Sequence, residues 1–129
     1  SRGLGDVYKR QDYIQCNYIT KKGGTYMSRN PHLPLTETTF YILLVLTTPA
    51  HGYAIIQEIE KLSNGFVKVA AGTMYGAIEN LLKLNWIEEI PNREKRRRVY
   101  KITDIGEEVL TLEIERLRSL IKLSSEFGY

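Results

Sequence analysis

The chain has 129 residues, 43% of them hydrophobic and 26% charged, which is ordinary for one globular domain. One cysteine and two histidines exclude an internal disulfide and leave too few ligands for a metal site, so no metal or cofactor is expected. No stretch approaches about eighteen uninterrupted apolar residues and no secretory leader is visible, which predicts a cytoplasmic protein outside the membrane.

Positive charge gathers in one short segment of the chain. Residues 1–26 carry five Lys or Arg and two Asp or Glu, whereas residues 27–129 carry thirteen of each sign. Because most of the chain is neutral, any affinity for nucleic acid must come from local clustering of cations. The one dense cluster lies in residues 93–98 and consists of Arg93, Lys95, Arg96, Arg97 and Arg98.

Residues 1–33 are predicted to lie outside the folded domain. The first 26 show no sustained helical or strand period, so a loose arm is expected. Residues 21–24 can be encoded by a purine-rich run resembling a ribosome-binding site, and the opening residues resemble translated adapter sequence. We therefore expect Met27 to be the true start of the protein. The alternative is a basic arm that reaches into the minor groove of DNA.

Two helices are predicted next. Thr36 can cap the first, which ends before Pro49 and contains the apolar residues Phe40, Leu43, Leu44 and Leu46. Residues 49–52 form a tight connection. The second helix covers residues 53–62, and its inward side chains are Ile55, Ile56, Ile59 and Leu62. Asn64 and Gly65, a dipeptide typical of turns, then close it.

A third helix begins at Gly72 and has one apolar and one polar side. The predicted buried side consists of Met74, Ile78, Leu81 and Leu82. The free side consists of Gly72, Thr73, Gly76, Glu79, Asn80 and Lys83. Its small residues would let the helix approach a partner surface closely, and Asn85 suits a left-handed helix end.

A cationic hairpin follows this helix. Trp86, Ile87 and Ile90 predict a short strand, and its return partner contains Val99, Tyr100 and Ile102. We therefore predict a mainly α, α+β fold over residues 34–103, a winged helix-turn-helix with a two-stranded wing. In such a protein the third helix enters the major groove, and the wing lies along phosphates or the minor groove.

Residues 104–129 are predicted to form a dimerisation helix that begins after Thr103. Apolar residues repeat at four-three-four spacing, a coiled-coil-like seam of Leu110, Ile114, Leu117 and Ile121. The apolar surface is widened by Val109, Leu112, Leu120 and Leu123, so a second copy of the helix is the expected cover. The alternative is that the helix folds back on its own domain.

These residues together resemble the PadR family of bacterial transcriptional regulators. The motifs that carry the resemblance are His51-Gly52-Tyr53, Gly72-Thr73-Met74-Tyr75, Leu81, Trp86-Ile87-Glu88, Arg96-Arg97-Arg98-Val99-Tyr100 and Ile102-Thr103-Asp104-Ile105-Gly106. The resemblance covers nearly all of residues 35–125. With a single C-terminal helix the chain looks like the shorter of the family's two architectures, unless it is a truncated longer form.

The resemblance implies a dimeric repressor that binds a palindromic operator in double-stranded DNA. A small hydrophobic or aromatic effector, often a phenolic acid, would release it. Thr73 and Tyr75 would contact DNA from the third helix, and residues 96–98 would hold phosphates. Family members often carry basic residues at the positions where this chain has Glu79 and Asn80, so a different operator specificity is implied. Some drug-binding members have a tryptophan where this chain has Leu117, which argues against aromatic stacking there.

Alternative roles remain for several candidates. The chain shows no phosphate-binding glycine loop and no paired nucleophile and base, so an enzyme is not expected. The competing interpretation is a winged-helix module that binds a protein, which Glu79 and the neutral charge favour. Tyr75 can pack under the wing, Lys83 can face solvent, and residues 96–98 can form a solvated turn. The predicted DNA-binding residues are Thr73, Tyr75, Gly76, Glu79, Asn80, Lys83, Arg96, Arg97 and Arg98.

Overall fold

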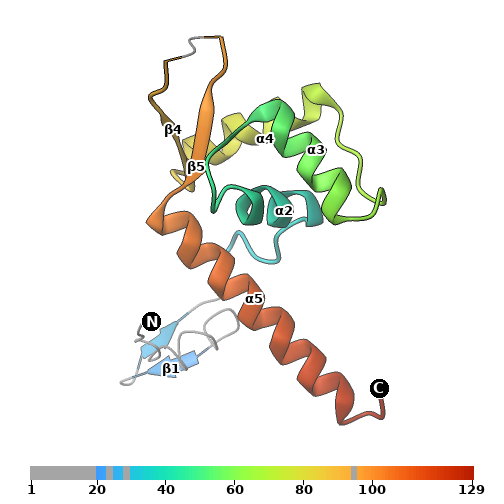
Figure 1. Ribbon diagram of the computed structural model, residues 1–129. Helices are drawn as coiled ribbons and strands as arrows, with labels where there is room; N and C mark the ends of the chain where they lie inside the picture. Colours follow the sequence, from blue (N-terminus) through green and yellow to red (C-terminus); the bar gives the residue numbers. More distant parts are fainter. Residues whose placement is uncertain (1–19, 23–24, 28–29, 94–95) are drawn as a thin grey trace. The chain divides into compact units, whose positions relative to one another are not determined.

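The computed structural model describes residues 20–22, 25–27, 30–93 and 96–129 (Figure 1). The chain divides into two compact units, one of residues 36–110 and the other of residues 1–35 with 111–129. None of the helices in the described part is both long and apolar enough to span a membrane.

The head of the chain was expected to be a loose arm, and most of it lies outside the described residues. The part that is described forms a small antiparallel hairpin of β1 (Thr20–Lys22) and β2 (Thr25–Met27). Strands of three residues are too short to produce a recognisable period in the sequence. The interpretation of Met27 as the start of the protein stays a prediction.

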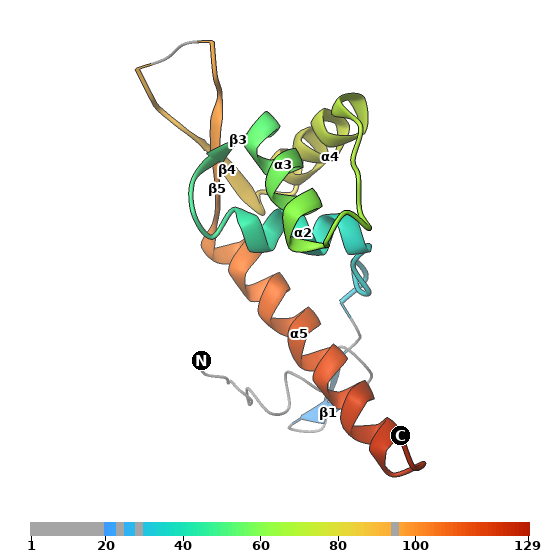
Figure 2. The same ribbon diagram turned by 45° about the vertical axis from the view of Figure 1, so that its right-hand side comes forward.

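The unit of residues 36–110 contains three helices and a small sheet. The helices are α2 (Glu37–Val45), α3 (Gly52–Leu62) and α4 (Ala71–Lys83). An antiparallel sheet in the order β3-β5-β4 joins β3 (Ala50–His51), β4 (Ile87–Ile90) and β5 (Val99–Ile102). Both views show α3 lying beside α2 and α4, with the sheet at their edge (Figures 1 and 2). The predicted winged helix-turn-helix fold is confirmed.

One strand and one buried position differ from the sequence prediction. The tight connection of residues 49–52 contains β3, which pairs Ala50 with Tyr100 and adds a third strand to the predicted pair. Leu62 was predicted to face inward, but its side chain is 48% exposed. It is the last residue of α3, and it lines an open groove with Leu44 rather than the core.

The core of this unit is built from one face of each helix and the inner face of the sheet. Of the four residues predicted to be buried in α4, Met74, Ile78 and Leu81 are buried and Leu82 is half-buried. The other buried apolar residues of the unit are Ile42, Leu43, Leu46, Ile55, Ile59, Trp86, Ile87, Tyr100, Ile102, Val109 and Leu110. Burial of this apolar surface is what stabilises the unit, and it leaves the opposite face of α4 uncovered.

Side chains cap the first turns of α2 and α3, and the cap from Thr36 was predicted. The Oγ1 atom of Thr36 accepts a hydrogen bond of 3.1 Å from the Thr39 N–H at the start of α2. His51 caps α3 through its Nδ1, which accepts from the Ala54 N–H at 3.3 Å. Each such cap satisfies one backbone donor that the first helical turn leaves unpaired.

Asparagines with a left-handed backbone end α3 and α4, and the one at Asn85 was predicted. Asn64 has a φ of 54° and Asn85 a φ of 61°. After α4, the N–H groups of Asn85 and Trp86 donate to the carbonyls of Leu82 and Leu81 at 3.0 Å each. These two hydrogen bonds together form the Schellman motif, which turns the chain sharply from α4 into the wing.

The last helix, α5 (Asp104–Ser125), begins against the base of the wing. Thr103 donates its hydroxyl to the Asn85 carbonyl at 2.6 Å and its N–H to the Trp86 carbonyl at 2.9 Å, and it caps α5 at Gly106. A Cβ atom on Gly106 would lie 2.1 Å from the Trp86 carbonyl oxygen. Glycine is therefore required where α5 crosses the start of β4.

Farther along, α5 belongs to the second unit, and its burial decreases toward the C-terminus. Glu113 forms a buried ion pair of 2.6 Å with Arg116 and accepts the Leu35 N–H at 3.0 Å. Of the predicted seam, Leu110 is buried and Ile114 half-buried, whereas Leu117 and Ile121 are 36% and 70% exposed. Leu120 and Leu123 are exposed as well. A single chain thus leaves the C-terminal half of the seam open.

Candidate nucleic-acid interface

One face of α4 is open along its whole length. All six residues of the predicted free side are exposed, namely Gly72, Thr73, Gly76, Glu79, Asn80 and Lys83. Nothing lies within 4 Å of a Cβ atom placed on Gly72 or Gly76. A partner surface can therefore approach the backbone of the first two turns closely, which the depth of a DNA groove requires of an inserted helix.

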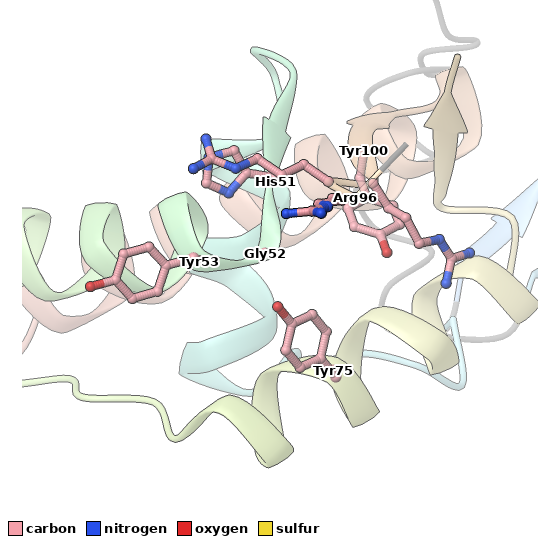
Figure 3. Close-up of a pocket in the computed structure, with 8 residues that line it drawn as sticks. His51, Gly52, Tyr53, Tyr75, Arg96 and Tyr100 are labelled. Atoms are coloured by element: carbon pink, nitrogen blue, oxygen red, sulfur yellow. The ribbon is translucent and has the colours of Figure 1, made fainter. Parts of the chain in front are cut away.

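The cationic turn lies beside the start of this helix. An open cavity of about 340 Å³ is lined by the beginning of α3, by α4, by β5 and by the turn (Figure 3). Its lining residues are His51, Gly52, Tyr53, Tyr75, Arg96, Arg97, Arg98 and Tyr100. The structure thus brings two predicted site segments together, although they are about twenty residues apart in the sequence. Lys95 of the same cluster lies outside the described residues.

Gly52, the first residue of α3, leaves room for the Tyr75 ring, which forms one wall of this cavity. A Cβ atom on Gly52 would lie 2.8 Å from Cε1 and 3.1 Å from the hydroxyl of Tyr75. The Tyr75 ring therefore lies against the start of α3 (Figure 3), and 49% of the residue stays exposed. This contact joins α3 to α4 and leaves the ring available to a partner in the cavity.

Tyr100 of β5 is the buried residue of the wing that also lines the cavity. It is 3% exposed, which confirms its predicted place in the sheet, and burial raises the pKa of its phenol. The guanidinium of Arg98 lies 5.7 Å from the centre of its ring, within cation–π range. Sequence reasoning assigned Tyr100 to the core and missed that it also lines the cavity.

Glu89 is a residue of this region that the sequence analysis missed. Its Oε1 accepts hydrogen bonds from Nη2 of Arg98 at 2.7 Å and from Nε at 3.1 Å. The bond from Arg98 holds the pKa of the Glu89 carboxyl below its usual value, and Glu89 in turn raises the pKa of the guanidinium. Glu89 pairs with Tyr100 across the hairpin, and Tyr100 is two residues from Arg98. Strand register was therefore the signal that could have found this diagonal contact.

The other described cations of the turn lie on its surface. Arg93, Arg96 and Arg97 are exposed, and the turn is closed by the side chain of Asn92, whose Nδ2 donates to the Arg97 carbonyl at 2.7 Å. Among the residues whose side chains are placed, no three His, Cys, Asp or Glu come together as a metal site would require. The region is therefore a cationic and tyrosine-lined surface next to an open helix.

Three packed helices, a short antiparallel sheet and a cationic wing beside an open helix define a winged helix-turn-helix protein. The model of the transcriptional regulator PadR-like family matches residues 42–112. The chain belongs to this family, whose members are transcriptional regulators.

Solved structures with the same fold include several regulators. A transcriptional regulator from Clostridium thermocellum has a TM-score of 0.58 and 23% identity, over 72% of this chain and 93% of that one. A PadR family regulator from Clostridium difficile has a TM-score of 0.58 and 22% identity, over 71% and 98%. Bacillus subtilis PadR in complex with operator DNA has a TM-score of 0.52 and 21% identity, over 60% and 46%. At these identities the likeness shows the fold. No curated protein matches the sequence.

Proposed function

We propose that this protein is a cytoplasmic, DNA-binding repressor that binds a palindromic operator as a homodimer. A small hydrophobic or aromatic effector would release it. The observation that supports DNA binding most strongly is the cavity at which the exposed arginines of the wing meet the open start of α4. Cations placed beside a free recognition helix are what a duplex with a charged backbone and a readable groove requires.

Roles for the individual residues follow from their positions. Gly76 lets α4 approach the groove closely, and Thr73 and Tyr75 at its start contact the backbone or base edges. Asn80 can read adenine and Glu79 can accept a hydrogen bond from cytosine, so both serve specificity. Phosphate contacts come from the cations at the two ends of the surface, which are Lys83, Arg96, Arg97 and Arg98.

The competing interpretation is a module that binds a protein. The salt dependence of the affinity for a DNA duplex distinguishes it from operator binding. Full-length protein would be titrated with a fluorescent duplex from immediately upstream of its own gene, at about 50 and 200 mM salt. Binding through phosphates predicts a linear fall of log affinity with log salt, with a slope of about −0.9 for each phosphate contacted. A scrambled duplex of equal length is the control. Affinity that does not depend on salt, or equal affinity for both duplexes, would contradict operator binding.

Dimerisation through α5 is expected because the exposed side of its seam needs a cover. Leu117→Lys would place an ammonium group at that seam, where a second helix would leave it buried and unpaired. The dissociation constant of the dimer is expected to rise at least about a hundredfold, from a cost of a few kcal/mol. Sedimentation equilibrium measures the change.

Ile105→Lys is the matched control for this prediction. Ile105 lies on the same helix, is 52% exposed and is outside the seam, so the same chemical change should leave the dimer intact. An unchanged molecular mass for the Leu117 variant, or a monomeric wild-type protein at micromolar concentration, would count against the dimer.

A further inference from the structure

The wing carries its own counter-charge. Glu89 on β4 contacts Arg98 through two hydrogen bonds to one carboxylate oxygen, at 2.7 and 3.1 Å. The two side chains are 42% and 56% exposed, so the pair lies on the surface that the proposed function assigns to DNA. No other ion pair is found between the described residues of the wing strands.

Two residues of the wing fix the position of the Arg98 side chain. Its guanidinium is held on one edge by Glu89 and lies over the buried ring of Tyr100. A phosphate can pair with this group only in competition with a carboxylate already at contact distance. Charge-assisted hydrogen bonds of this length are the stronger kind, so the competition matters.

Phosphate contacts carry no sequence information, since every site on DNA offers the same charge. An unmasked cation on the wing would therefore raise affinity for all duplexes alike. A carboxylate that occupies the cation lowers this general attraction by the same factor for operator and random DNA, and it leaves contacts to base edges unchanged. It therefore limits the overall affinity of the surface for DNA and its dependence on salt.

We propose that Glu89 is a positioning residue that competes with the phosphate backbone for Arg98 and so limits the general affinity of the wing for DNA. Its carboxylate weakens the phosphate contact that the proposed function gives to Arg98, and the pair orients Arg98 over the ring of Tyr100. This inference rests on the proposed DNA binding, and it concerns how strongly that same surface attracts any duplex.

The test compares Glu89→Gln with wild-type protein on the upstream duplex and on a scrambled duplex. Release of Arg98 should raise affinity for both duplexes about fivefold near 0.15 M salt and steepen the salt slope by about 0.9, as for one added phosphate contact. The operator-to-scrambled ratio should stay the same, because a phosphate contact carries no sequence information. Glu89→Asp keeps the charge but shortens the side chain, so it should steepen the slope as well.

Glu88→Gln is the matched control. Glu88 is the preceding residue of β4, is exposed and pairs with Lys101 on the neighbouring strand. Because successive strand residues face opposite sides, this variant removes the same charge without touching Arg98. It should leave the slope unchanged. In an Arg98→Ala background, Glu89→Gln should have no effect on the slope. Circular dichroism would verify that each variant is folded.

Several results would overturn the proposal. One is an unchanged salt slope in folded Glu89→Gln, and another is an equal change in Glu88→Gln. A third is a Glu89 effect that persists without Arg98, which would mean that the carboxylate acts only as a distant charge. In all three cases the wild-type protein still binds its operator with a salt slope, so the proposed function stands. Wild-type protein that binds no duplex would overturn both.

Discussion

Replacing Arg96 and Arg97 together by alanine is expected to weaken operator binding about a hundredfold, near tenfold for each lost charge-assisted contact. The salt slope should become shallower by about two units, since each lost phosphate contact removes about 0.9. Both arginines are exposed and line the cavity beside α4. Fluorescence anisotropy at several salt concentrations measures both quantities.

The control for this prediction removes two cations from another part of the same unit. Lys61 and Lys68 are exposed and are absent from the lining of the cavity. Changing both to alanine alters the net charge equally, so a purely global electrostatic effect would weaken binding as much. If the lysine pair and the arginine pair cost the same affinity, the wing has no special place in DNA binding.

Gly106→Ala is expected to destabilise the folded protein by about 3 kcal/mol or more. The new Cβ would lie 2.1 Å from the Trp86 carbonyl oxygen and 2.8 Å from Cγ1 of Ile102. The first of these atoms is backbone and also accepts the Thr103 N–H, so it cannot move without breaking the junction between α5 and the wing. Urea unfolding at one fixed protein concentration measures the change, because the stability of a dimer depends on concentration.

Gly76→Ala is the matched control, since the same methyl group would enter open space on the exposed face of α4. Alanine is the better helix former, so this variant should be more stable than wild type by about 0.5–1 kcal/mol. A Gly106 variant with wild-type stability would show that α5 does not begin against the Trp86 carbonyl as described.

Local chemistry explains why much of the fold could be predicted from the sequence. Thr36 and Thr103 cap helices because a hydroxyl can reach a backbone donor two or three residues ahead. Asn64 and Asn85 end helices because asparagine tolerates a left-handed backbone. The buried and exposed sides of α4 follow from helical periodicity alone. Each of these signals lies within a few residues of the feature that it determines.

The remaining features depend on contacts between distant residues. Strand β3 has only two residues and exists because β5 pairs with it, so no period could predict it. The pair of Glu89 and Arg98 requires the register of the hairpin, which the sequence predicted only as two apolar runs around a polar turn. Gly52 is needed because the ring of Tyr75 lies against it, a contact between α3 and α4.

Mapping the DNA-binding surface by chemical-shift changes tests the central proposal most directly. Nitrogen-15-labelled protein would be titrated with the upstream duplex, and amide signals followed through the titration. The proposed interface predicts the largest changes at Thr73, Gly76, Asn80 and residues 96–100, with little change in the groove of Leu44 and Leu62. Changes centred on that groove, with α4 and the wing unaffected, would contradict DNA recognition by the open helix and its cationic wing.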